Sequence, residues 1–104
     1  MSSQKQNDVR HAGDVEILDI QIPMYRLILY NDDYTAFDFV IELLNTLFHK
    51  NPADATRIAM FIHQKGKGTA GIYPKEIAEM KVSQVHQKAE DAGYPLRAGI
   101  EPDR

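Results

Sequence analysis

Cysteine is absent from this sequence of 104 residues. Without it the chain can form no disulfide framework and has no thiol nucleophile. Long apolar runs are absent too, since none approaches the roughly 20 residues that a membrane-spanning helix needs. The N-terminus also lacks the charged and then apolar pattern of a secretory signal. These absences predict a cytoplasmic protein with no membrane partner.

A strong charge of one sign is also missing, because the formal net charge is only −3. The sequence therefore lacks the basic surface that binding to nucleic acid requires, and no nucleic-acid partner is expected. The length fits a single domain, which can bury a modest core without disulfides or a metal ion.

Apolar residues are sparse at the start of the chain, which reads MSSQKQNDVRHAGD. Such a segment cannot bury enough surface to fold alone. We therefore expect residues 1–23 to form a mobile N-terminal extension. Residues 24–104 are expected to form one folded domain that begins near Met24.

Regular patterns of apolar residues fill the rest of the chain. MYRLILY, at residues 24–30, is rich in aliphatic and aromatic side chains and is typical of a buried strand. Helical spacing predicts helices at 36–48, 52–64 and 75–92. TAGIY and YPLRAGIE predict two further strands, the second weakened by a glycine. The order β-α-α-β-α-β predicts an α+β domain, with three helices covering one side of a small three-stranded antiparallel sheet.

The helix ends carry residues that commonly cap helices. Thr35 or Asp33 is expected to cap the first helix, and Asn51 the second. Gly93 is expected to end the third helix, because glycine readily adopts a left-handed conformation. On the third helix the following residues are expected to face inward: Ile77, Ala78, Val82, Val85 and Ala89.

The first helix has more apolar surface than one core contact needs. Ala36, Val40, Leu43, Leu44 and Leu47 share one face at helical spacing. Phe37, Ile41 and Phe48 fall outside the centre of that face, and the surplus raises the question of a second apolar contact.

Two carboxylates and an amide separate the first strand from the first helix, at Asn31, Asp32 and Asp33. One interpretation is local turn chemistry, in which these side chains bond to nearby backbone N–H groups. The other is a site for a positively charged group, such as an ammonium with its three donors. The spacing alone leaves both interpretations open.

His63 lies near the end of the second helix, on the same side as Ala59. It could be a core or capping histidine or a metal ligand, but the sequence contains no His-x₃-His pair to support a metal site. The segment GKGTAG lacks the P-loop pattern, so a turn is expected there. No nucleophile–histidine–acid set stands out. A charged face on the third helix, with Glu76, Glu79 and Lys81, is either solvated or a docking surface.

Several stretches together resemble the ClpS family of bacterial adaptor proteins in the N-degron pathway. These stretches are YRLILYNDDYTAFDFVIELL, ATRIAMFIHQKGKG, GIYPKEIAEMKVSQV and a PL pair near the end. The resemblance runs from about Met24 to Leu96. It implies a non-enzymatic adaptor that needs no cofactor or metal. Such an adaptor binds proteins that begin with Leu, Phe, Tyr or Trp and delivers them to the ClpA unfoldase of the ClpAP protease.

The resemblance also implies roles for particular residues of this chain. Asn31, Asp32 and His63 would receive the α-amino group, with His63 neutral so that one ring nitrogen can accept a hydrogen bond. Asp33 and Thr35 would support the loop or the peptide backbone. The apolar pocket would be formed by Phe37, Ile41, Ala59, Ile62 and Leu96. Glu76 and Lys81 would dock on the N-terminal domain of the unfoldase.

The chain departs from the family pattern at two of these pocket positions. The family usually has methionine where this sequence has Phe37 and again where it has Ala59. Phenylalanine is stiffer than methionine, so we expect a pocket of different outline with narrower preferences. These departures suggest the hypothesis that the protein is a specialised second copy of the adaptor.

Overall fold

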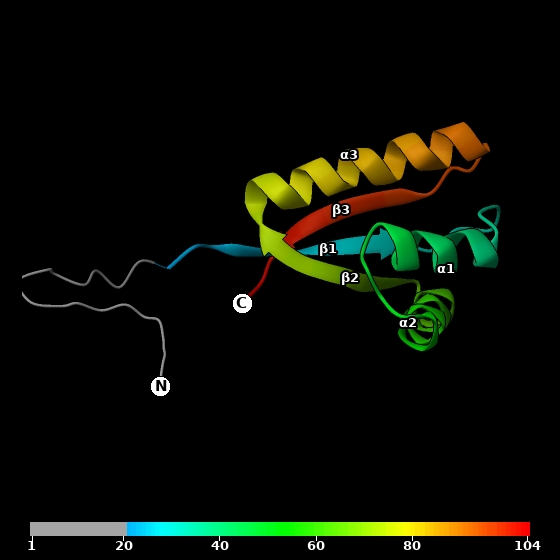
Figure 1. Cartoon of the computed structure of the whole chain (residues 1–104), viewed down its shortest axis with the longest axis horizontal. Helices are drawn as coiled ribbons and strands as arrows, with labels where there is room; N and C mark the ends of the chain where they lie inside the picture. The colour runs from blue at the N-terminus through cyan, green and yellow to red at the C-terminus, as the bar shows by residue number, and fades with distance from the viewer. Residues whose placement is uncertain (1–20) are drawn as a thin grey trace, which may run out of the picture.

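The computed structural model describes residues 21–104. An N-terminal extension was predicted at residues 1–23, and residues 1–20 of it lie outside the described residues. Secondary structure begins at Met24, and the elements follow the order β-α-α-β-α-β that the sequence predicted (Figure 1). They are β1 (Met24–Tyr30), α1 (Phe37–Thr46), α2 (Pro52–Lys65), β2 (Lys67–Pro74), α3 (Lys75–Ala92) and β3 (Arg97–Pro102).

The three strands form one antiparallel sheet in the order β2-β1-β3, as expected for an α+β domain of this kind. β1 is the central strand, and its side chains alternate between the two faces. Leu27 and Leu29 are completely buried and belong to the core cluster that the helices contribute to. The predicted three-stranded sheet with three helices is therefore confirmed.

Each helix has its own place around the sheet. α3 packs along all three strands, while α2 packs on β2 and on α1. In Figure 1, α1 and α2 lie where β1 ends, at the opposite end of the sheet from the start of α3. The core joins Val40, Leu43 and Leu44 of α1 to Val85 and Ala89 of α3. The layered arrangement thus leaves the segment after β1 surrounded by α1 and α2.

The capping prediction holds for two helices and is wrong for the first. Asn51 accepts a hydrogen bond from the amide of Asp54, and Gly93 ends α3 in the left-handed conformation. The N-cap of α1 is Ala36, and no side chain caps it. The reason is that the Thr35 hydroxyl donates to Asp32 instead, so the loop holds itself together before the helix begins.

Two of the predicted helix faces also need correction. Ile77 is 41% exposed, because the first turn of α3 extends beyond the helices that cover the sheet. Phe48 is 4% exposed and packs in the core, since it follows α1 in the connection to α2 and is no longer tied to the helical spacing.

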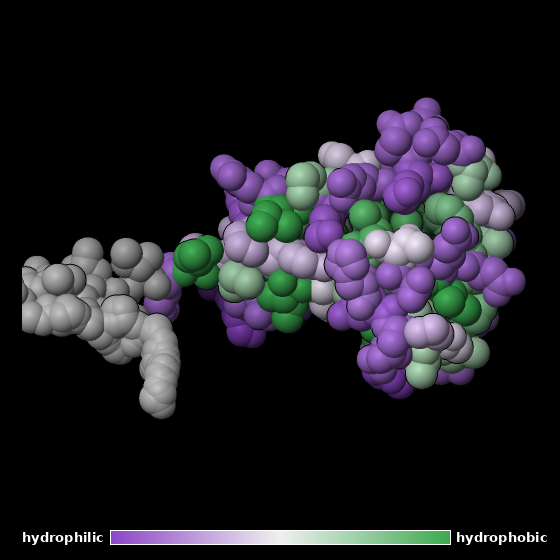
Figure 2. All heavy atoms as spheres, in the orientation of Figure 1, coloured by the Kyte–Doolittle hydropathy of each residue, from purple (hydrophilic) through white to green (hydrophobic). Residues whose placement is uncertain are grey.

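The surface is mixed, with hydrophilic residues surrounding separate hydrophobic patches (Figure 2). None of the helices in the described part of the chain is long and apolar enough to cross a membrane. Exposed large apolar side chains include Met60 and Phe61 on α2, Ile72 on β2, and Ile77 and Met80 on α3.

Candidate functional site

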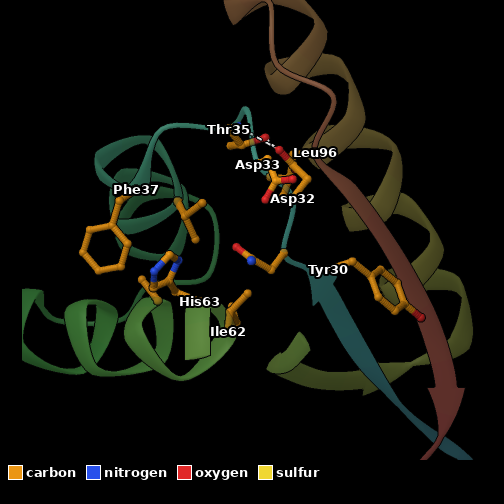
Figure 3. A pocket seen from close by; sticks show the side chains of 11 residues that line it. Tyr30, Asp32, Asp33, Thr35, Phe37, Ile62, His63 and Leu96 are labelled. Carbon is orange, nitrogen blue, oxygen red and sulfur yellow. Dashed lines mark hydrogen bonds between the residues drawn. The ribbon is translucent and has the colours of Figure 1, made fainter. Parts of the chain in front are cut away.

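A cavity of about 260 Å³ opens where β1 ends, between the following loop, α1, α2 and the residue before β3. Figure 3 shows Phe37 and His63 on one side of it, and Asp32, Asp33, Thr35 and Leu96 on the other. Four separate segments of the chain therefore supply its walls. Its lining consists of Tyr30, Asn31, Asp32, Asp33, Thr35, Phe37, Val40, Ala59, Ile62, His63 and Leu96.

The loop on the polar side is held by Asp32. Its Oδ1 accepts from the amides of Tyr34 at 2.8 Å and Thr35 at 2.7 Å. Its Oδ2 accepts from the Thr35 hydroxyl at 2.7 Å. These bonds match the turn chemistry that the sequence left open for this cluster.

The same contacts set the charge of Asp32. Partial burial raises the pKa of its carboxyl, but the hydrogen bonds from Thr35 and Tyr34 favour the charged form and bring the pKa below its ordinary value of 3.8. Asp32 is therefore a negative charge at the cavity, fixed in position by the loop.

A backbone contact joins this loop to the end of α2. The amide of Asn31 donates to the carbonyl of Gly66 at 2.9 Å. Gly66 ends α2 with a φ of 96°, a conformation that glycine adopts without strain. This contact brings the amide side chain of Asn31 and the imidazole of His63 to the same cavity.

Asp33 differs from Asp32 in its surroundings. It is exposed and lines the cavity. Within residues 21–104 its carboxylate accepts no hydrogen bond and forms no ion pair with another residue. The side-chain hydrogen bonds within the loop are thus made by Asp32 with Tyr34 and Thr35, and the supporting role expected of Asp33 stays a prediction.

The other side of the cavity is apolar. Val40, Ala59, Ile62 and Leu96 are all buried, with Ala59 only 2% exposed. Phe37 is half-buried, and its ring meets the His63 ring edge-on, with the centroids 6.2 Å apart and the planes at 75°. One cavity thus combines buried apolar residues with exposed polar side chains.

The structure brings most of the predicted site residues together, with one exchange. Ile41 does not line the cavity but packs half-buried against the core, and Val40 takes its place in the lining. The sequence placed Val40 on the inward face of the first helix. Helical spacing of apolar residues cannot distinguish a residue of the core from one that lines a cavity. Tyr30 was also missed, and Figure 3 shows its ring directed away from the cavity toward β3.

The two residues expected to dock on a partner lie apart from this cavity. Glu76 is exposed in the first turn of α3. Lys81 is half-buried, and its ammonium donates to the carbonyl of Leu47 at 3.1 Å. The same ammonium lies 5.7 Å from the ring centroid of Phe48 and 5.3 Å from that of Tyr73. Lys81 thus ties α3 to the end of α1.

A metal centre is not formed by the residues around the cavity. Across residues 21–104, no group of three or more histidine, aspartate or glutamate side chains is placed to hold a metal ion. The exposed Asp33 and His63 line the cavity beside its buried apolar residues, where they can accept hydrogen bonds from a cationic group.

Comparison with known proteins places this arrangement in a family. The family described as "ATP-dependent Clp protease adaptor protein ClpS" matches residues 21–99. The ClpS of Nautilia profundicola is 50% identical over 89 residues, which cover 86% of this chain and 90% of that protein. The ClpS of Acetivibrio thermocellus is 51% identical over 80 residues, covering 77% of this chain and 81% of that protein.

A solved structure has the same fold. It is Agrobacterium tumefaciens ClpS2 bound to L-phenylalaninamide, with a TM-score of 0.76 and 30% sequence identity. The match covers 80% of this chain and 100% of that chain. By sequence and by fold, this chain belongs to the ClpS family of ATP-dependent Clp protease adaptor proteins.

Proposed function

We propose that this adaptor binds the N-terminal residue of a protein when that residue is large and hydrophobic, and delivers the protein to a Clp protease. The observation that carries the proposal is the single cavity that combines buried apolar walls with a carboxylate, an amide and an imidazole at its mouth. A free N-terminal residue presents the complementary pair of groups, an apolar side chain and an ammonium attached to the same Cα. The relative bound to L-phenylalaninamide supports this assignment, because that ligand has the same two groups.

The ammonium would be received by Asn31, His63 and a carboxylate. The α-amino group has a pKa of about 7.7–8.0, so it is mostly cationic at neutral pH. Asp32 already accepts three hydrogen bonds from its own loop. Asp33 has an exposed carboxylate at the same cavity. We therefore propose Asp33 as the direct partner of the ammonium, with Asp32 and Thr35 shaping the loop and adding negative charge.

The side chain of the bound residue would enter between Val40, Ala59, Ile62 and Leu96. Burying a leucine or phenylalanine side chain stabilises a complex by roughly 1.5–3 kcal/mol. Charge-assisted hydrogen bonds contribute roughly 1.5–3 kcal/mol each. After the cost of association these contributions correspond to binding on the order of micromolar.

Phe37 gives the pocket a rigid wall beside His63, with the two rings in edge-on contact. Ala59 gives it a small residue at a buried position. We expect these two residues to narrow the range of first residues that bind well. Titrations with peptides that differ only at the first residue test this, and equal affinities for Leu, Phe, Tyr and Trp would contradict it. Membership of a specialised second group of adaptors stays a prediction.

The unfoldase partner would be the N-terminal domain of a ClpA-type protein in the cytoplasm. Glu76 is placed to contribute to such contact because it is exposed in the first turn of α3. Lys81 has donors left beyond the one that Leu47 accepts, but its ammonium also supports α1. The proposal therefore assigns docking chiefly to Glu76 and gives Lys81 a double role.

The decisive experiment compares two peptides of one sequence, one with a free N-terminal phenylalanine and one acetylated. Acetylation removes the charge and donors of the ammonium while leaving the side chain unchanged. We expect the free peptide to bind and the acetylated peptide to bind at least about tenfold more weakly, the loss of one charge-assisted bond. Equal binding of both peptides, or no binding of either, would contradict the proposed function.

A further inference from the structure

His86 forms a contact that lies outside the binding cavity but close to one of its walls. β3 is an edge strand, because the sheet order is β2-β1-β3. The amides on its outer edge therefore have no neighbouring strand to accept their hydrogen bonds. The amide of Ala98 on this edge donates to Nε2 of His86 at 3.0 Å. α3 thus supplies through a side chain the acceptor that the sheet does not.

The direction of this bond fixes the state of the imidazole. A backbone N–H can only donate, so Nε2 must accept, and the ring is neutral with its proton on Nδ1. Protonation would put a hydrogen on Nε2 and leave two donors facing each other. Imidazole is the side chain that gains a proton between about pH 8 and pH 5. The contact is therefore one that acidification breaks.

Leu96, a buried wall of the cavity, lies between two anchors of the segment that joins α3 to β3. On one side, the amide of Tyr94 donates to the carbonyl of Ala89 at 2.8 Å. The Tyr94 ring also packs on Phe39 with the centroids 5.0 Å apart. On the other side, β3 pairs with β1 from Arg97 onward, and the outward amide of Ala98 adds the bond to His86.

We infer that neutral His86 is a positioning residue that holds the Leu96 wall of the binding cavity, and that its protonation releases this wall and weakens binding of the N-terminal residue. The inference rests on the proposed function, since it concerns the affinity of the same cavity. His86 itself does not line the cavity. It acts through Ala98 and the short segment that carries Leu96.

The sheet presents no charged group to this contact. Ala98 and Ile100 pair with Leu29 and Leu27, which are buried beneath the helices. Because side chains alternate along a strand, the charged residues of β3 point to the opposite face, where Glu101 pairs with Arg26 at 3.3 Å. These charged residues are Arg97 and Glu101. β2 contributes Tyr73, whose pKa is raised by burial.

The helix itself adds one ionisable group near His86. Glu90 lies one turn further along α3, on the same side of the helix. Lys88 and Asp91 line a groove against α1, on the other flank of α3. Lys81 is also on that flank, where it is bonded to Leu47. His86 is thus the group whose ring nitrogen meets the Ala98 amide.

The test measures the affinity of a free N-terminal phenylalanine peptide between about pH 8 and pH 5.5 for four proteins. These are the full chain, His86→Gln, His86→Leu and His49→Asn. Glutamine offers an amide oxygen that can accept from Ala98 but does not titrate, whereas leucine offers no acceptor. His49 is exposed and has a φ of 59°, which asparagine tolerates, so its replacement removes an imidazole elsewhere. The peptide and the residues that line the cavity are the same in all four proteins, so ratios of affinity isolate the substituted residue.

We expect His86→Gln to bind as tightly as the full chain at pH 8 and to lose less affinity on acidification. The ratio of the two affinities should change by roughly fivefold, the equivalent of one hydrogen bond, while His49→Asn should follow the full chain. His86→Leu should bind about fivefold more weakly already at pH 8. Nitrogen NMR should show an unprotonated Nε2 on His86 and an Ala98 amide signal that titrates with it.

Two outcomes would overturn the inference. A constant ratio between the full chain and His86→Gln across the pH range would show that the contact does not position the wall. An Ala98 amide that does not respond when His86 titrates would show that the bond is absent in solution. If His86→Leu fails to fold, the comparison with His86→Gln still decides the point. Absence of binding by the full chain at pH 8 would instead contradict the proposed function, and the inference would fall with it.

Discussion

Neighbouring aspartates in the loop after β1 have different surroundings despite identical side chains. Asp32 accepts three hydrogen bonds inside the loop, whereas the exposed Asp33 carboxylate faces the cavity mouth. A sequence shows only two adjacent carboxylates. Which of them turns back to its own loop depends on backbone geometry, which the spacing of residues along the chain does not report.

Replacing each aspartate by alanine tests this difference. Asp33→Ala should leave the free energy of unfolding within about 0.5 kcal/mol of the original, since the side chain is exposed. The same variant should bind a free N-terminal phenylalanine peptide roughly ten- to a hundredfold more weakly. Asp32→Ala should lower the free energy of unfolding by about 1–2 kcal/mol, because the amides of Tyr34 and Thr35 lose their acceptor. Denaturant unfolding measures the stability of each variant, and peptide titration measures its affinity. Unchanged peptide binding by Asp33→Ala would show that Asp33 does not contact the ammonium.

Asp32 should also make the stability of the domain depend on pH in the acid range. Its folded pKa is held below the ordinary value of 3.8 by the hydrogen bonds from Thr35 and Tyr34, which outweigh burial. Its contribution is therefore fully present above about pH 4 and is lost as pH falls through the folded pKa. The difference in free energy of unfolding between the protein and Asp32→Asn should shrink between pH 6 and pH 2.5. A difference that stays constant over this range would contradict the assignment.

At the scale of the elements, the close approach of α2 to β2 sets one wall of the cavity. Gly68 is buried on β2, and a Cβ built there would lie 2.8 Å from Cγ1 of Ile62 and 3.1 Å from Cδ2 of Phe61. Ile62 is 3% exposed and lines the cavity, so it has little room to move except toward the bound side chain. The glycine thus allows the helix to pack at the distance that keeps the cavity open.

Gly68→Ala should therefore affect stability and binding together. We expect a loss of roughly 1–3 kcal/mol in the free energy of unfolding, the usual effect of overpacking. Binding of a peptide that begins with phenylalanine should weaken more than binding of one that begins with leucine, because the cavity becomes smaller. Gly99→Ala is the matched control, since its Cβ would meet the Tyr30 hydroxyl at 3.4 Å and fits without a shift. Equal effects of the two substitutions on stability and binding would contradict this account.

Much of this architecture follows from the sequence because local signals and tertiary packing agree. The β1 segment is apolar on both faces, and Asn51 and Gly93 have the side chains or backbone freedom that their caps need. The sequence located β2 less completely: it indicated a turn at GKGTAG, but only Gly66 has a left-handed backbone there, and Lys67 already pairs with Tyr30. Pairing with β1 extends this strand toward its N-terminal end. The local residue preferences of GKGTAG contain no information about a partner strand that is distant in the chain.

On the scale of the whole molecule, the cavity and the proposed docking residue lie at opposite ends of the sheet. Asn31 directly follows the last residue of β1, whereas Glu76 follows the strand end at Pro74, which pairs with Met24 at the beginning of β1. Seven residues of extended strand separate the two ends, a distance of about 20 Å. An adaptor arranged in this way can hold a protein at one end and the unfoldase at the other without competition between them.

This separation predicts that the two binding events are energetically independent. Sites more than about 7–10 Å apart with no shared partners usually add within roughly 0.5 kcal/mol. Glu76→Ala should weaken binding to the unfoldase N-terminal domain and leave peptide affinity unchanged, and Asp33→Ala should do the reverse. Lys81 is unsuitable for this test because its ammonium also supports Leu47 and the end of α1. The coupling energy can be measured by calorimetric titration with peptide, in the presence and absence of saturating unfoldase domain. The titrations use the unsubstituted protein, the two single variants and the double variant. A coupling energy above about 1 kcal/mol would mean that binding of the unfoldase domain changes the cavity, and it would contradict the prediction that the two sites are independent.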